Sequence, residues 1–254
     1  MYDIAIIGAG AAGIACSKSA IENGLKVLLI EIGKSSFGGT CLNKGCIPTK
    51  FLLNSSKKQK TWKDSFIEKN EIVEKIKEPL FKFLESKGVD IILDKCSFLD
   101  NKTLDVGGKE VKAKNIIIAT GSLPKTIINH PKIIFADDIF TNSVLPDKIL
   151  IIGAGAIGIE FASMCNNFGK SVVMVEKEKL ILPTFDSYFS KRLKMLLQKK
   201  GIKIETDKSA SDLDLNDFDM IISAVGRIPN IENLKIENSG VSCDELGWIK
   251  TDKL

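Results

Sequence analysis

The 254-residue chain is long enough for one large or two medium domains, and its 44% hydrophobic and 27% charged residues are typical of a globular protein. Lysine and arginine exceed aspartate and glutamate by only 36 − 32 = 4 residues, which argues against a nucleic-acid or membrane-surface partner. No apolar run is long enough to cross a bilayer, and the N-terminus lacks the basic leader of a signal peptide. We therefore expect a cytoplasmic protein.

An internal repeat is the strongest pattern in the chain. Residues 4–31, IAIIGAGAAGIACSKSAIENGLKVLLIE, match residues 149–176, ILIIGAGAIGIEFASMCNNFGKSVVMVE, at a constant offset of 145. Each copy is predicted to form an apolar strand, a glycine-rich turn, a helix and a second apolar strand that ends in glutamate. The matched positions are Gly8, Gly10, Gly13, Gly24 and Glu31 in the first copy and Gly153, Gly155, Gly158, Gly169 and Glu176 in the second.

These positions have the physical properties of a dinucleotide-binding turn. The first glycine of each copy permits the tight turn, the second lets the backbone approach a pyrophosphate, and the third lets the helix pack closely on the sheet. The helix N-terminus offers free N–H groups to the phosphates, and the glutamate can accept hydrogen bonds from a ribose. Two such sites in one chain indicate a flavin and a nicotinamide that exchange a hydride.

Glu176 bears on which nicotinamide binds. A 2′-phosphate would meet its carboxylate, so NAD is favoured over NADP, although Lys177 and Lys179 weaken that preference.

The repeat predicts an α/β fold with two Rossmann-like, doubly wound domains. We place the boundary before Pro146, with an FAD-binding domain at residues 1–145 and an NAD-binding domain at residues 146–254. Between the copies, residues 71–88 have the apolar spacing of an amphipathic helix that Pro79 is expected to kink or restart. Short strands are expected to follow before residue 122.

Two cysteines five positions apart, Cys41 and Cys46, lie in the stretch GGTCLNKGCIPTK at residues 38–50. A structural disulfide would close a very short loop and contribute only about 2 kcal/mol. A metal site needs further ligands, and the single histidine, His130, is distant in the sequence, so we expect no metal. A redox disulfide is favoured, because the dipole of a helix starting here and the nearby Lys44 would favour a thiolate.

At this point the sequence resembles a known family. The stretch GGTCLNKGCIPTK, the two glycine-rich units, IIIATGSLP at residues 116–124 and ISAVGRIPN at residues 222–230 are similar to the pyridine nucleotide–disulfide oxidoreductases. Within that family the phrase GTCLNKGCIP is most similar to the dihydrolipoamide dehydrogenase class. The resemblance extends through essentially the whole chain.

The resemblance implies a role for each matching residue. Cys46 would be the thiol nearest the flavin, Cys41 would exchange with the substrate disulfide, and Lys50 would lie by the flavin and pair with Glu160. In the first domain Gly8, Gly10, Gly13, Glu31, Gly39, Thr40, Cys96, Ala119, Thr120 and Gly121 would border FAD. In the second domain Gly153, Gly155, Gly158, Glu176, Gly226 and Arg227 would border NAD.

The resemblance also implies an activity. Electrons would pass from a dithiol substrate, a small molecule or a lipoyl domain resembling dihydrolipoamide, through Cys41 and Cys46 and then FAD to NAD. Members of the family are homodimers and continue into a C-terminal dimerisation domain, which we expect to be absent from this chain, since it stops at GWIKTDKL. The alternatives are an NAD(P)H-dependent disulfide or mercuric reductase, and a non-catalytic nucleotide-binding remnant.

Overall fold

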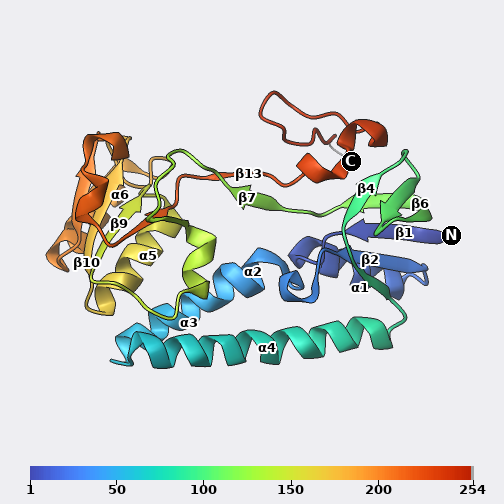
Figure 1. Cartoon of the computed structure of the whole chain (residues 1–254), viewed down its shortest axis with the longest axis horizontal. Coiled ribbons are helices and arrows are strands. Elements are labelled where there is room, and N and C mark those ends of the chain that lie inside the picture. The colour runs from blue at the N-terminus through green and yellow to red at the C-terminus, as the bar shows by residue number, and fades with distance from the viewer. Residues whose placement is uncertain (253–254) are drawn as a thin grey trace. The chain divides into compact units, whose positions relative to one another are not determined.

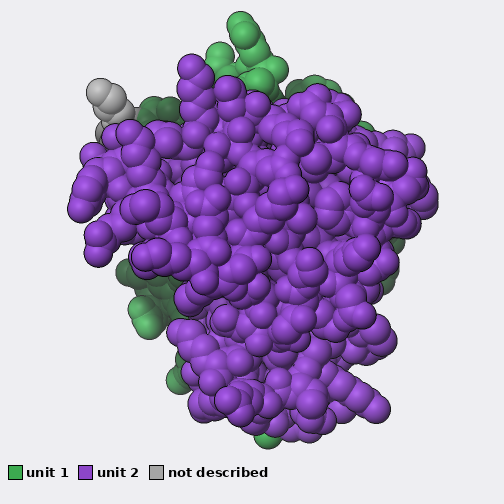
Figure 2. Space-filling view, turned by 90° about the vertical axis from the view of Figure 1, so that its left-hand side faces the viewer, with its two compact units in different colours: residues 1–46, 72–123, 227–254 green, residues 47–71, 124–226 purple. Residues whose placement is uncertain are grey.

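The computed structural model describes residues 1–252, which form two compact units. Unit 1 comprises residues 1–46, residues 72–123 and the chain from Arg227 onward, whereas unit 2 comprises residues 47–71 and 124–226 (Figure 2). The units therefore do not follow the expected boundary at residue 146. Leu52 and Trp62 belong to the hydrophobic core of unit 2, and a strand before residue 146 pairs with a strand of unit 2, which explains the difference. The assignment of one cofactor to each domain stays a prediction.

Unit 1 is built on a six-stranded sheet with the order β3-β2-β1-β6-β5-β4. The strands β1, β2, β3 and β6 run parallel, and β4 and β5 add an antiparallel extension to β6. The bounds are Tyr2–Ile7 for β1, Val27–Glu31 for β2, Asp90–Leu93 for β3, Cys96–Phe98 for β4, Thr103–Val106 for β5 and Lys109–Ile118 for β6. The short strands expected before residue 122 are confirmed.

The central strands of unit 1 are apolar on both faces because both faces are covered. Ile6 and Leu29 pack on one face with residues of the helices α1 (Ala11–Glu22) and α4 (Trp62–Ser86). Their neighbours along the strands, Ile7 and Leu28, pack on the other face. This alternation is what a strand imposes on consecutive side chains, and it explains why the buried strands read as continuous apolar runs. Figure 1 shows α4 as one continuous helix, so Pro79 does not restart it.

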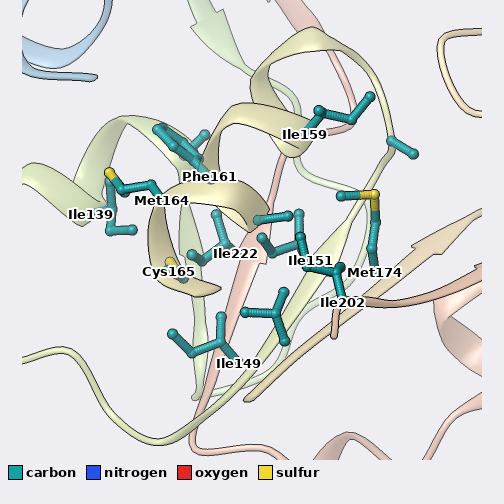
Figure 3. Packing of buried hydrophobic residues seen from close by; sticks show 14 of the residues in the cluster. Ile139, Ile149, Ile151, Ile159, Phe161, Met164, Cys165, Met174, Ile202 and Ile222 are labelled. Carbon is teal, nitrogen blue, oxygen red and sulfur yellow. The ribbon is translucent and has the colours of Figure 1, made fainter. Parts of the chain in front are cut away.

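Unit 2 has an all-parallel sheet with the order β11-β10-β9-β12-β8. Ile149, Ile151 and Ile222 pack with Phe161 and Cys165 of α5 on one face (Figure 3), while other residues of the same strands face a second cluster. The strand bounds are Ile133–Phe135 for β8, Lys148–Ile152 for β9, Ser171–Glu176 for β10, Lys203–Thr206 for β11 and Met220–Ser223 for β12. The helices of unit 2 include α5 (Ala156–Asn167) and α6 (Ser187–Lys199).

The remaining helices and strands lie outside the two main sheets. The short helices α2 (Gly39–Lys44) and α3 (Cys46–Lys57) follow β2, and the strands β7 (Ser122–Pro124) and β13 (Arg227–Pro229) form a two-stranded ribbon. Among residues 1–252, no helix combines the length and the apolar character that crossing a membrane would require.

The repeat seen in the sequence is reproduced in the backbone. The N–H of Gly8 donates to the carbonyl of Ile30, and the N–H of Gly153 donates to the carbonyl of Val175, both at 2.8 Å. Two Rossmann-like parallel β-α-β units are therefore confirmed, one in each compact unit.

Candidate functional site

The first glycine of each copy takes a backbone conformation that other residues rarely adopt. Gly8 has φ of +105° and Gly153 has φ of +99°. A Cβ atom at Gly8 would lie 2.4 Å from the carbonyl oxygen of Ala119, and one at Gly153 would lie 2.6 Å from that of Ala224. The turn therefore passes directly over the end of the neighbouring parallel strand, where only glycine fits.

The third glycine of each copy sets the distance between the helix and its own turn. A Cβ atom at Gly13 would lie 1.9 Å from the carbonyl oxygen of Gly8, and one at Gly158 would lie 2.0 Å from that of Gly153. We call residues 8–13 and 153–158 the first and second glycine loops. This geometry agrees with the roles expected from the sequence, in which the first glycine permits the tight turn and the third lets the helix pack closely on the sheet.

The helices that follow the loops begin without a side-chain cap. Gly10 and Gly155 are the N-caps of α1 and α5, and neither supplies a side-chain hydrogen bond. By contrast, the Asp186 carboxylate caps α6 and accepts from Tyr188 and Phe189. Helix N-termini with uncapped N–H groups suit phosphate oxygens. The two loops therefore fit the pyrophosphates of dinucleotide cofactors.

The glutamates that end β2 and β10 hold the glycine loops. Ala9 donates its backbone N–H to Glu31 Oε2, and Ala154 donates its backbone N–H to Glu176 Oε2, both at 2.7 Å. The second carboxylate oxygen accepts from Ile32 at 2.9 Å in the first copy and from Glu178 at 3.0 Å in the second. A carboxylate has about four acceptor positions, so ribose binding stays a prediction beside this bracing role.

The cysteine pair lies at a turn between two helices. Cys41 is in α2, Cys46 is the first residue of α3, and Gly45 separates the helices. A Cβ atom at Gly45 would lie 3.0 Å from the carbonyl oxygen of Thr40 and 3.3 Å from the Cα of Cys41. The small residue thus lets the chain turn back on itself, so that Cys46 follows directly after the backbone has returned to Cys41.

The six cysteines, all within residues 1–252, are free thiols. The hydrogen bond to the Cys46 thiol, together with burial, raises the pKa of Cys41. The expected stabilisation of a thiolate is therefore not found at Cys41 in this dithiol form. Cys46 is exposed, so one thiol of the pair is open to solvent while the other is half-buried.

The expected pair of Lys50 and Glu160 is present within unit 2. Lys50 Nζ forms an ion pair with Glu160 Oε1, and these residues lie on α3 and α5. Lys50 is one helical turn after Cys46 on α3, a spacing that places the two residues on the same side of the helix. The lysine side chain is 63% exposed, which allows it to reach a bound group.

Residues 119–121 lie at the end of β6, next to the first glycine loop. Ala119 donates its N–H to the carbonyl of Ile7 at 2.8 Å. Asn230 anchors the next two residues, since its side chain donates to the carbonyl of Thr120 at 3.2 Å and its backbone N–H donates to that of Gly121 at 3.1 Å.

Two side chains on the β7–β13 ribbon support the same region. Arg227 Nε donates to Ser122 Oγ at 2.8 Å, and Arg227 Nη2 donates to the carbonyl of Ser122 at 2.7 Å. Arg227 therefore binds the chain just after Gly121 and belongs to unit 1, whereas the sequence analysis expected it in the second domain. Sequence reasoning missed Ser122 and Asn230, although each lies inside a quoted motif.

The remaining predicted residues are less informative. Cys96 begins β4 in unit 1, where burial raises the pKa of its thiol to about 12. Thr40 is on α2, next to Gly39, where a Cβ atom would lie 2.6 Å from the Cα of Gly10. Gly226 has φ of +117°, and its carbonyl accepts from the N–H of Lys125 at 3.0 Å.

Comparisons with known proteins agree with this geometry. The chain is 30% identical to the dihydrolipoyl dehydrogenase of Chlamydia trachomatis over 290 residues, which cover 99% of this chain and 62% of that protein. It is 27% identical to a mercuric reductase of Staphylococcus aureus, with 99% of this chain and 53% of that protein covered. The alignments leave more than a third of each relative unmatched.

Solved structures give the same result. The HOCl-induced flavoprotein disulfide reductase RclA from Escherichia coli superimposes with a TM-score of 0.92 at 30% identity, covering 99% of this chain and 62% of that one. The family model described as pyridine nucleotide-disulphide oxidoreductase matches residues 2–254. With its two glycine loops, its close cysteine pair and its matched length, the chain belongs to the pyridine nucleotide-disulphide oxidoreductase family.

Proposed function

We propose that the chain is the dinucleotide-binding part of a flavoprotein that oxidises a dithiol resembling dihydrolipoamide and reduces NAD. The tight turn at Gly45 carries this proposal, because a Cβ atom there would lie 3.3 Å from the Cα of Cys41, so the chain returns to Cys41 directly before Cys46. The first glycine loop and residues 119–121 would hold FAD, and the second glycine loop would hold NAD. The cysteine content favours a reducing compartment such as the cytoplasm.

The chain's own residues account for the sulfur chemistry. In the oxidised form, a thiolate of the substrate attacks the Cys41 sulfur, the Cys41–Cys46 bond breaks, and Cys46 leaves as a thiolate. The second thiol of the substrate then displaces Cys41, so that the substrate becomes a disulfide and the protein a dithiol. A bound flavin would accept the two electrons from the dithiol and pass them as a hydride to the nicotinamide.

Lys50 and Glu160 have a positioning role in this proposal. The carboxylate of Glu160 holds the ammonium group of Lys50 one turn of α3 away from Cys46. A cation fixed there is placed to offset the negative charge of the Cys46 sulfur that is released on reduction. Lys50→Met should therefore slow disulfide exchange while leaving the affinity for NADH unchanged.

The choice of NAD depends on Glu176. Glu176 is 8% exposed and its carboxylate already braces the second glycine loop, so a 2′-phosphate arriving nearby would meet a negative charge. Glu176→Gln keeps an acceptor oxygen for the N–H of Ala154 and removes that charge. NADH should bind the unmodified chain about tenfold more tightly than NADPH, and Glu176→Gln should narrow the difference. The matched variant Glu31→Gln should leave it unchanged, and equal affinities in the unmodified chain would contradict the assignment.

A disulfide reductase driven by NAD(P)H is the second candidate. Relatives of similar identity include a mercuric reductase at 27% and a glutathione reductase at 28%. The same sulfur exchange runs in either direction, so the two candidates differ in substrate rather than in residues.

The test of function is a spectrum and a thiol map. We expect the purified chain, mixed with FAD, to bind flavin and to lose two titratable thiols on mild oxidation, mapped by mass spectrometry to Cys41 and Cys46. Cys41→Ser should abolish exchange with a dithiol and leave flavin binding nearly intact. Loss of flavin binding together with the disulfide would instead show that the bridge is structural.

A further inference from the structure

Asn43 lies between the two cysteines and makes an unusual number of contacts for one side chain. Its amide nitrogen donates to the backbone carbonyls of Phe37 and Gly39, both at 2.9 Å, and of Ser36 at 3.3 Å. An amide has only two N–H donors, so one of them is shared between acceptors. The side chain therefore ties the cysteine segment, residues 41–46, to the backbone just before it.

The carbonyls that Asn43 contacts belong to a firmly held part of unit 1. Phe37 is fully buried and packs edge-on against Phe81, with ring centroids 5.0 Å apart. Gly38 donates its N–H to the carbonyl of Ala9 at 2.8 Å, which is the residue that Glu31 braces. Asn43 thus connects the cysteine segment to the first glycine loop through this buried backbone.

We propose that Asn43 is a positioning residue for the redox pair, which keeps Cys41 and Cys46 close together in the dithiol form. The proposal rests on the proposed function of the two cysteines as a redox couple. The amide holds α2 against residues 36–39, so that the turn at Gly45 returns Cys46 to Cys41 rather than letting α2 swing away.

A looser segment would shift the equilibrium between dithiol and disulfide. In the disulfide form, the S–S bond itself holds the two sulfurs together. In the dithiol form, only the surrounding protein can hold them close. When the brace is removed, the dithiol gains freedom and the disulfide becomes easier to reduce. In exchange with dithiothreitol, the protein S–S bond breaks, an S–S bond forms in the reagent, and two electrons and two protons pass to the protein.

The experiment equilibrates the full chain with mixtures of reduced and oxidised dithiothreitol and measures the disulfide fraction by mass spectrometry. Asn43→Ala removes all three contacts, whereas Asn43→Ser leaves a hydroxyl that can still reach the carbonyl four residues earlier, as Ser17 reaches Gly13 at 2.8 Å. We expect the equilibrium constant for reduction to rise about five- to tenfold in Asn43→Ala, where tenfold is about 30 mV, and by less in Asn43→Ser.

The matched control is Asn23→Ala. Asn23 also donates its side-chain amide to the carbonyl four residues earlier, Ser19, at 2.8 Å, but its bond is exposed and far from the cysteines in the sequence. The Asn23→Ala change should leave the equilibrium between dithiol and disulfide unchanged. Thermal unfolding of each variant separates a change in redox equilibrium from a change in stability.

Several outcomes overturn the proposal. An unchanged equilibrium in both Asn43 variants would show that the amide does not position the thiols, and an equal shift in Asn23→Ala would show that the effect is general. If neither Asn43 variant folds, Asn43 is a stability residue of unit 1 and the positioning role is wrong. If the unmodified chain forms no Cys41–Cys46 disulfide, the proposed function fails first, and the disulfide map distinguishes that case.

Discussion

The two β-α-β repeats are alike in how they hold the glycine loop and different in what covers it. In both, the residue between the first two glycines is braced by a glutamate through its N–H, while its carbonyl accepts from the chain after the second strand. The donors to that carbonyl are Gly38 at 2.8 Å in the first repeat and Leu182 at 2.9 Å in the second. The same scaffold is thus built twice from the same few contacts.

The difference lies at the second glycine. A Cβ atom at Gly10 would lie 3.7 Å from the Cα of Gly39, whereas a Cβ atom at Gly155 would meet nothing within 4 Å. After Gly38 the first repeat leads into α2, whose first residue, Gly39, packs backbone against backbone on the first glycine loop. After Leu182 the second repeat leads into α6. The two loops therefore differ in the segment that follows the second strand of each repeat.

The largest expected effect breaks both loops in the same way. Gly13→Ala and Gly158→Ala each place a Cβ atom about 2 Å from a backbone carbonyl oxygen, so the helix must move away from the sheet. We expect each change to lower the free energy of unfolding by about 3 kcal/mol or more. The measurement is chemical denaturation. Gly155→Ala is the control variant, and its free energy of unfolding should equal that of the unmodified chain. A tolerated Gly158→Ala would mean that the two loops are not equivalent.

Two buried lysines sharpen the comparison between the units. In unit 1, Lys77 is paired with Glu74 at 2.8 Å, whereas in unit 2 the Lys69 ammonium donates to the carbonyl of Phe140 at 2.6 Å and lies over the ring of Phe66. Burial lowers the pKa of Lys69 to about 8 from the usual 10.5. Between these pH values the unfolded chain binds more protons than the folded one, so stability contributed by Lys69 rises with pH.

Between pH 8 and pH 10.5, Lys69 is expected to raise the free energy of unfolding by at most about 3 kcal/mol. This gain should disappear in Lys69→Met and persist in Lys77→Met. The measurement is chemical denaturation across that pH range, with each variant compared with the unmodified chain so that other groups cancel. A pH profile that is the same in Lys69→Met and the unmodified chain would show that Lys69 is not desolvated.

The glutamate braces give a smaller and graded effect. Glu31→Ala and Glu176→Ala each leave the N–H of an alanine in the loop without its charged acceptor, which costs about 2 kcal/mol. Glu176 is buried and Glu31 is half-buried, so the change at Glu176 should be the larger. Thermal unfolding would rank the two, and the opposite order would contradict this interpretation of their burial.

Sequence reasoning predicted the parts of the fold that depend on local pattern. The offset of 145 predicted both glycine loops, because the demand for glycine comes from contacts within one β-α-β unit. The pairing of Lys50 with Glu160, 110 positions apart, came from the family resemblance rather than from any spacing. Membership of residues 47–71 in unit 2 depends on tertiary packing of Leu52 and Trp62, which no local pattern reveals.

The contacts around the cysteines were also beyond the sequence. An asparagine in a short helix has no preferred partner, so the three carbonyls that Asn43 contacts follow only from the path of residues 36–39. The same holds for the raised pKa of Cys41. A nearby helix and Lys44 suggested the opposite direction, but the neighbouring Cys46 thiol and burial raise the pKa of Cys41.

The most direct test of the two-site account is a crossed binding experiment with Gly10→Ala and Gly155→Ala. Neither change strains the fold, because φ is negative at both positions and the added Cβ atoms have room. Calorimetric titration of each variant with FAD and with NADH should show weaker FAD binding only in Gly10→Ala and weaker NADH binding only in Gly155→Ala. A variant that loses affinity for both FAD and NADH would contradict the assignment of one dinucleotide to each loop. So would unchanged affinities for both cofactors in the two variants.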